Sequence, residues 1–243
     1  MRVDLYQDLY KQEDTHFWHI AKREMVKLLI KKFVLHTKYQ KRILDVGCGT
    51  GKNIETFSEF GDVSGIDMSD EAILFAKKRG LQNVFKSSAN HMPFNDSNYD
   101  IVTMLDVLEH IDETDLVEVN RILKNEGYLI VNVPAFGFLW SKWDEILHHK
   151  RRYTKKTLSD ALNKFGFEVV FTTYHFSYLL IPALIFRYFK SKKPAEKYTS
   201  DFDNSNPAIQ IIGTVLSKLE RILVGFSVVI PFGTSVICIA RKK

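Results

Sequence analysis

Three glycines follow a short apolar run in the segment ILDVGCGTGKN, residues 43–53. Gly47, Gly49 and Gly51 are separated by single residues, and such a run lets backbone N–H groups approach a ligand closely. A helix that begins directly after them would add a positive dipole end, which suits a carboxylate or a phosphate. The segment therefore predicts a ligand-binding turn between a strand and a helix.

The spacing of these glycines narrows the choice of ligand. A P-loop needs Gly, four residues and then Gly-Lys-Ser/Thr, whereas Val46 takes the place of its first glycine and Asn53 that of its hydroxyl residue. The dinucleotide fingerprint would place its third glycine one residue after Gly51. Both a nucleotide triphosphatase and a dinucleotide oxidoreductase are therefore disfavoured. Asp67, 20 residues after the first glycine, suits ribose hydroxyls in any adenosine ligand.

Alternating strands and helices must position this turn. We expect strands at 42–46, 63–66, 83–86, 99–105 and 127–133, and helices at 20–35, 52–60, 69–79 and 115–123. That rhythm is typical of an α/β fold with a doubly wound, mostly parallel sheet that helices cover on both faces. In such a sheet ligands bind beyond the carboxyl ends of the strands, where the glycines lie.

The composition suits one globular domain. The 243 residues are 45% hydrophobic and 26% charged, which allows a full core. Residues 1–20 contain no apolar run of a secretory signal, and no segment reaches the roughly 18 apolar residues of a membrane span, so we expect a cytoplasmic protein. Cys48 and Cys238 are too few for a disulfide framework or a zinc site, so no metal is expected.

The positive charge is distributed in short clusters. The net charge is +5, and basic residues gather at 150–156, 190–193 and 241–243. A nucleic-acid-binding surface would spread its cations along one face. We therefore expect no nucleic-acid partner and mostly solvated cations.

Four motifs together resemble the class I S-adenosylmethionine-dependent methyltransferases, and within them the type 11 and type 12 small-molecule domains. They are LDVGCGTG, GIDMS, MPF followed by YDIV, and LDVLEHI, and they span roughly residues 40–135. The resemblance implies a seven-stranded Rossmann-like fold. It also implies S-adenosyl-L-methionine as the cofactor and S-adenosyl-L-homocysteine as its product.

The resemblance assigns contacts to the methionine part of that cofactor. The three glycines, with Cys48 between them, would pass under it, and Asp45 would help to hold its amino group. Asp106, after the fourth strand, would lie near the amine and the sulfonium. A capping role in the following turn is the alternative for Asp106.

The adenosine part would lie between two further segments. By resemblance, Asp67 would bind the ribose hydroxyls and Met68 would pack on adenine. The family usually has an Asp five residues before the proline of MPF, where this chain has Ser88 followed by Ala89. A hydroxyl accepts a hydrogen bond more weakly than a carboxylate, so adenine would be held less firmly.

Two segments outside the core extend the resemblance. HFWHIAKR, residues 16–23, is similar to an amino-terminal element that lids the cofactor, which would place Trp18 and Lys22 there, with Lys22 in place of the usual Arg. HHKRRYT, residues 148–154, resembles the element Gly-His-x-Arg-Arg-Tyr-Thr on the substrate side. Three of its side chains could hold an anionic or hydroxylated substrate: Arg151, Arg152 and Tyr153.

Methyl transfer to a hydroxyl needs a base. His149 is the first candidate, because imidazole titrates near neutral pH, and His110 in the LEHI turn is the second. The alternative for each histidine is a hydrogen bond within its turn, and for His110 this structural role is favoured.

The carboxyl-terminal third carries two apolar stretches, at 176–190 and 222–232. The first is either a core or homodimer-interface helix, or a cover over a lipid-linked substrate, with peripheral membrane contact through 176–193. Residues 236–243 read as the last strand of the sheet, antiparallel to 168–172.

We expect a single methyltransferase domain over 1–243. It comprises a helical cap at 1–38, a cofactor-binding core at 40–135 and substrate-side elements at 136–243. The predicted reaction moves a methyl group to a small-molecule or lipid-linked acceptor, at oxygen. A non-catalytic cofactor-binding module is the alternative. A nucleic-acid methyltransferase is disfavoured, since it would show Asp/Asn-Pro-Pro-aromatic where this chain has LDVLEH.

Overall fold

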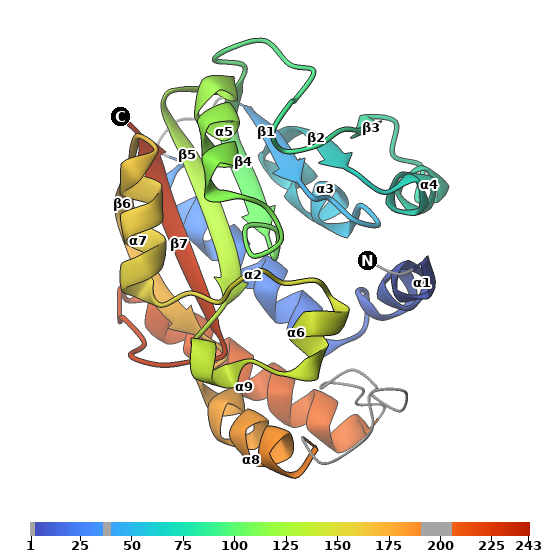
Figure 1. Cartoon of the computed structure of the whole chain (residues 1–243), viewed down its shortest axis with the longest axis vertical. Coiled ribbons are helices and arrows are strands. Elements are labelled where there is room, and N and C mark those ends of the chain that lie inside the picture. The colour runs from blue at the N-terminus through green and yellow to red at the C-terminus, as the bar shows by residue number, and fades with distance from the viewer. Residues whose placement is uncertain (1–2, 36–39, 191–205) are drawn as a thin grey trace.

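Seven strands form one sheet in the order β3-β2-β1-β4-β5-β7-β6. The computed structural model describes residues 3–35, 40–190 and 206–243 (Figure 1). The strands are β1 (Lys41–Val46), β2 (Gly61–Asp67), β3 (Val84–Lys86), β4 (Tyr99–Leu105), β5 (Leu123–Pro134), β6 (Phe167–His175) and β7 (Ser235–Lys242). Only β7 runs antiparallel to its neighbours, and it pairs Arg241 with Glu168, as the sequence predicted. The α/β fold with a mostly parallel seven-stranded sheet is confirmed.

Helices cover both faces of this sheet. They are α1 (Val3–Gln12), α2 (Phe17–Phe33), α3 (Lys52–Phe57), α4 (Asp70–Lys78), α5 (Leu116–Ile122), α6 (Lys142–Ile146), α7 (Lys155–Lys164), α8 (Leu180–Lys190) and α9 (Pro207–Gly225). In Figure 1, α5 and α7 lie in front of the sheet and α2 lies behind it. Ser69 caps α4 and Thr154 caps α7, each by accepting a backbone hydrogen bond, as predicted.

Several element boundaries differ from the predicted ones, and β5, expected from residue 127, begins at Leu123. Helix α2 begins at Phe17 because the His16 side chain caps it. The helix expected at 52–60 ends as an α-helix at Phe57 and closes with a short 3₁₀ turn. The apolar helix expected from residue 176 begins only at Leu180, because Phe176 adopts a left-handed φ of +58°. The lysines expected beside it at 192 and 193 lie outside the described residues.

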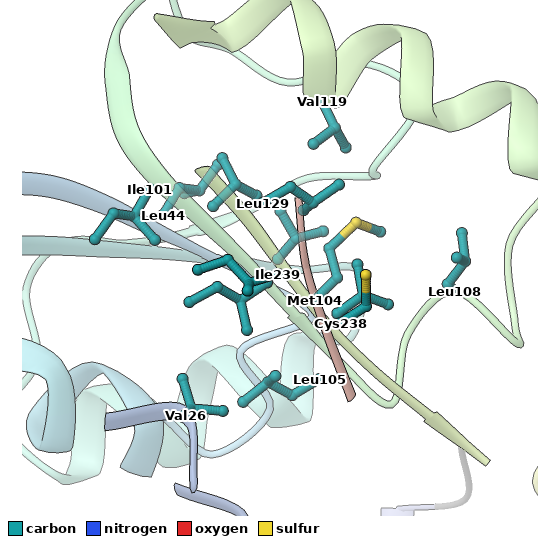
Figure 2. Close-up of a cluster of buried hydrophobic side chains, with 14 of the residues drawn as sticks. Val26, Leu44, Ile101, Met104, Leu105, Leu108, Val119, Leu129, Cys238 and Ile239 are labelled. Carbon is teal, nitrogen blue, oxygen red and sulfur yellow. The ribbon is translucent and has the colours of Figure 1, made fainter. Parts of the chain in front are cut away.

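The core lies on both sides of the central strands. Leu44, Ile101 and Ile239 come from three different strands and are fully buried. Figure 2 shows Val26, from α2, on one side of these strands and Val119, from α5, on the other. Because both faces of the sheet are covered, the polar side chains of the site gather at the ends of the strands.

Candidate active site

The turn after β1 has a backbone conformation and close neighbours that favour glycine at three positions. Gly47, Gly49 and Gly51 have φ angles of +69°, +54° and +87°, a left-handed backbone that other residues rarely adopt. A Cβ on Gly47 would lie 2.4 Å from Val107, and one on Gly51 would lie 2.4 Å from Leu81. The turn therefore needs glycines at the spacing that the sequence shows.

Asp67, the last residue of β2, lies beside this turn. Its Oδ2 accepts a hydrogen bond from the Gly49 N–H at 3.0 Å, and its Oδ1 accepts one from the Ser69 N–H at 2.9 Å. Burial raises the pKa of Asp67, and the two backbone donors oppose that rise. Met68 is 66% exposed beside it, so its side chain is open to a flat ligand. The structure brings the predicted ribose and adenine residues together.

The segment around Ser88, expected to contact adenine, lies beside the end of β2 as well. The Ser87 N–H donates to the Asp67 carbonyl at 3.0 Å, which fixes this segment to the end of β2. Ser88 forms an isolated backbone bridge with His91, and Ala89 is buried. Ser88 and Ala89 thus lie close in the chain to a residue bonded to β2, and their contact with adenine stays a prediction.

Helix α1 is tied to the glycine turn by a buried network. The Leu9 side chain of α1 lies next to Gly49, where a Cβ would be 3.5 Å from it. Glu13, directly after α1, pairs with Arg79 and accepts a hydrogen bond from the Thr50 hydroxyl. Sequence reasoning missed this network, since Glu13 and Arg79 are 66 residues apart. The network gives the cap a fixed place against the turn.

Asp45 is fully buried at the end of β1. Its Oδ1 accepts a hydrogen bond from the Thr103 hydroxyl at 2.6 Å, and its Oδ2 accepts one from the Asn53 amide at 3.1 Å. Burial raises the pKa of Asp45 to about 6, although the two hydrogen bonds favour its charged form. Asp45 therefore joins β1, β4 and α3, and contact with a cofactor amine stays a prediction.

Asp106, directly after β4, meets the amino-terminal cap. Its carboxylate pairs with the buried Lys22 ammonium and accepts a hydrogen bond from the Asn132 amide at 2.7 Å. The Lys22 Nζ also lies 4.1 Å from the centroid of the Trp18 ring. Asp106 has a φ of +59°, so the chain turns sharply at the end of β4. Trp18, Lys22 and Asp106 therefore lie at one place, and their contact with a cofactor stays a prediction.

The two candidate bases lie against each other. The rings of His110 and His149 meet edge to face with centroids 4.6 Å apart. The His149 Nδ1 lies 2.9 Å from the Asp144 Oδ1. Burial and the neighbouring His149 lower the pKa of His110 to about 4. His148, where the family element has glycine, adopts a left-handed φ of +58°.

Glu109 completes this cluster and was missed by sequence reasoning. It is 1% exposed, and its Oε2 has no hydrogen-bond partner within the part of the chain that the structure describes. Burial and the nearby Asp106 raise the pKa of Glu109 well above its usual value. Ligand atoms of Glu109, His110 and His149 lie within 4.8 Å of one another, so their type and spacing could also hold a divalent cation.

Two residues of the basic segment after His149 form polar contacts within the chain. Arg152 is buried and forms a two-pronged ion pair with Asp144, at 2.8 Å from Nε and 2.9 Å from Nη2. Tyr153 is also buried, and its hydroxyl donates to Glu113 at 3.1 Å. The polar groups of Arg152 and Tyr153 are therefore engaged within the chain, and contact of either residue with a substrate stays a prediction. Arg151 stays partly exposed, 3.7 Å from Glu113.

Asp144 is the second residue that the sequence did not reveal. It lies in the short helix α6, and its carboxylate is fully buried between Arg152 and His149. These two partners hold the pKa of Asp144 far below its usual value, despite the burial that opposes them. No motif identifies Asp144, since its role depends on the fold of residues 141–152.

A comparison with protein families decides the class. Residues 44–131 match the family model of a methyltransferase domain. This segment of the chain is a methyltransferase domain. The matched segment runs from β1 into β5 and includes the glycine turn, Asp67 and Asp106, so the family and the fold imply use of S-adenosylmethionine.

Similar proteins agree with this class. An uncharacterized protein of Methanocaldococcus jannaschii is 28% identical over 199 residues, which are 69% of this methyltransferase and 73% of that protein. The ubiquinone biosynthesis O-methyltransferase of Bordetella avium is 34% identical over 84 residues, 32% of this chain. The matched part is only 35% of the Bordetella enzyme. The likeness to that enzyme is therefore local.

A solved structure supports the fold over the whole chain. It is a Haloferax volcanii methyltransferase in complex with the Trm112 methyltransferase activator. The two structures have a TM-score of 0.63 and share 16% sequence identity, and the match covers 99% of this chain and 93% of the other. At this identity the likeness shows the fold alone.

Proposed function

We propose that this methyltransferase moves the methyl group of S-adenosyl-L-methionine to a hydroxyl of a small-molecule or lipid-linked acceptor. The observation that carries the proposal is the Asp144–His149 pair. It lies beside Glu109 and His110, which directly follow the cofactor-side turn at Asp106. An oriented imidazole next to a methyl-donor site is the arrangement that transfer to a hydroxyl requires.

The residues around the glycine turn fit the cofactor. The turn leaves no room for side chains at Gly47 and Gly51, and the half-buried carboxylate of Asp67 lies beside it. The proposed contacts are Asp45, Gly47, Cys48, Gly49, Gly51, Asp67, Met68, Ser88, Ala89, Asp106, Trp18 and Lys22. When bound, the cofactor supplies an electrophilic methyl group on a sulfonium. The chain supplies alignment, which alone can lower a barrier by roughly 7–11 kcal/mol.

His149 acts as the general base in this proposal. Asp144 accepts the hydrogen bond from Nδ1–H of His149, which leaves Nε2 with a lone pair to receive the acceptor proton. Arg152 keeps Asp144 ionised, so the carboxylate holds the ring in this tautomer. His110 is the second candidate, and its lowered pKa keeps it neutral at neutral pH.

Two observations support oxygen and an apolar acceptor. The Bordetella relative is named an O-methyltransferase of ubiquinone biosynthesis, and ubiquinone is a lipid. Large apolar side chains of α8 and α9 are also exposed on this chain, among them Ile181, Ile185 and Ile211. Partly exposed Arg151 is the cation that we assign to an anionic part of the acceptor.

The proposal predicts a large loss of turnover for His149→Ala. Methyl transfer from labelled cofactor to a panel of hydroxylated acceptors, lipid-linked sugars first, should fall about 10²–10⁴-fold in kcat, with cofactor affinity unchanged. Lys156→Ala is the matched control, since its side chain is exposed and pairs only with Asp160 among the described residues. Undiminished turnover in His149→Ala at saturating acceptor would remove this histidine as the base.

Two further results would redirect the proposal. Turnover that EDTA abolishes and Zn²⁺ restores would assign Glu109, His110 and His149 to a metal ion. Cofactor binding without transfer to any acceptor would favour the non-catalytic binding module.

A further inference from the structure

Helix α9 exposes its large apolar side chains and buries polar ones, the reverse of the usual pattern of a surface helix. Three of its buried residues are small or polar, Gly213, Ser217 and Glu220, and the fourth is Val224. Its exposed residues are largely aliphatic: Ile209, Ile211, Ile212, Val215, Leu219, Ile222 and Leu223. A surface helix normally buries its large apolar side chains and exposes polar ones, so this pattern needs a partner that is itself apolar.

Specific contacts fix this orientation of α9. A Cβ on Gly213 would lie 2.6 Å from the Phe17 ring, so only glycine lets α9 approach α2 this closely. The Tyr178 and Ser217 hydroxyls are 2.5 Å apart. Glu220 accepts hydrogen bonds from the Phe176 and Ser177 N–H groups, each at 2.8 Å. The polar groups of α9 are thus held inward, and rotation about its axis would break these bonds.

The neighbouring segments extend the exposed apolar face. In α8, Ala183 is buried while Ile181, Leu184 and Ile185 are exposed. The segment 226–232, directly after α9, adds four more exposed side chains: Phe226, Val228, Val229 and Phe232. Phe226 is 79% exposed, although burial of an aromatic ring is strongly favourable. We call α8, α9 and 226–232 together the apolar face.

The charged residues on the apolar face indicate which kind of partner it binds. Glu220 is the one acidic residue in the sequence of α8, α9 and 226–232, and it is 4% exposed. Among the side chains that the structure describes on this face, the cations are Lys218 and Arg221, and Arg221 pairs with Glu24 of α2. An apolar face that carries cations and no exposed carboxylate complements an anionic lipid surface. A second copy would place like charges opposite one another.

The face belongs to the same end of the molecule as the candidate active site. Figure 1 shows α8 and α9 together at the lower end, below α6. Helix α8 contacts the turn Gly137–Leu139, which leads into α6, and the Phe176 ring stacks on Trp18 at 5.7 Å. None of the described helices has the length and hydrophobicity to span a bilayer, so contact would lie in the plane of the membrane.

From these observations we infer that the apolar face docks on the surface of a bilayer that contains anionic lipids. Its Ile, Leu, Val and Phe side chains enter the boundary between headgroups and acyl chains, and Lys218 meets lipid phosphates. This partner goes beyond the proposed reaction and does not depend on it, because the argument uses no catalytic residue.

Co-sedimentation with vesicles tests the inference. The full chain is mixed with vesicles of phosphatidylcholine alone and with vesicles that also contain phosphatidylglycerol. We expect binding to the mixed vesicles that weakens with added salt and falls by at least about tenfold in the double variant Ile211→Ser, Phe226→Ser. Val117→Ser is the matched control, since Val117 is 61% exposed on α5, outside this face, and it should bind as the native protein does.

Two outcomes would overturn the inference. One is equal vesicle binding by the double variant and the native protein. The other is a native dimer in sedimentation velocity that does not bind vesicles and that the double variant converts to a monomer, which would make the face a self-association surface. Titration with S-adenosylhomocysteine in each variant separates these results from failure of the cofactor site.

Discussion

At the residue scale, the two buried carboxylates of the site have opposite pKa shifts. Asp144 keeps its charge because Arg152 and His149 both bond to it. Asp45 has only neutral hydrogen-bond donors from Thr103 and Asn53, so burial dominates and its pKa rises to about 6. The charged carboxylate of Asp144 is suited to orient a base. The burial of Asp45, in contrast, destabilises the folded protein when its carboxylate is charged.

Because the buried charge of Asp45 destabilises the fold, we expect Asp45→Asn to stabilise the protein in a pH-dependent way. A folded pKa above the unfolded one means that the native state holds the proton longer, so stability falls as pH rises from about 4 to about 6. Above that range the variant should be more stable than the native protein by on the order of 2 kcal/mol, and the gain should vanish below about pH 4. Urea unfolding at several pH values measures this. A gain that is independent of pH would contradict the assignment.

At the element scale, the sequence predicts those strands and helices that depend on the local pattern of apolar residues. The runs at 99–105 and 236–243 contain β4 and most of β7, because alternation and apolar length mark buried strands. Asp144, Glu109 and the Glu13–Arg79 pair could not be predicted, because their partners are set by packing between distant segments. The exposure of α9 was equally hidden, since an apolar segment normally predicts a core.

The close packing of α9 on α2 gives a stability prediction. Gly213→Ala should destabilise the fold by roughly 1–3 kcal/mol, because the new Cβ would stand 2.6 Å from the Phe17 ring. Gly137→Ala is the control, since a Cβ there would meet nothing within 4 Å, and it should change the free energy of unfolding by less than about 0.5 kcal/mol. Chemical denaturation measures both. Equal effects would mean that α9 does not pack as described.

At the scale of the whole molecule, one end carries everything that the proposed reaction needs. The cap around Lys22, the turn after β1 and the Asp144–His149 pair meet beyond the carboxyl ends of the parallel strands. The sheet brings these segments to one end, so the motifs spread over residues 16–154 lie where the proposed site requires them. The apolar face lies at that end too, which would bring a membrane-borne acceptor to the base (Figure 1).

The most direct test of the central claim is calorimetric titration with S-adenosylhomocysteine of the native protein, Asp67→Ala and Asp70→Ala. The native protein should bind it, Asp67→Ala should lose most of that affinity because the carboxylate beside Gly49 is gone, and Asp70→Ala should not, since that side chain is 76% exposed. No binding by the native protein, or unchanged binding by Asp67→Ala, would contradict the account, as would tighter binding of NADH.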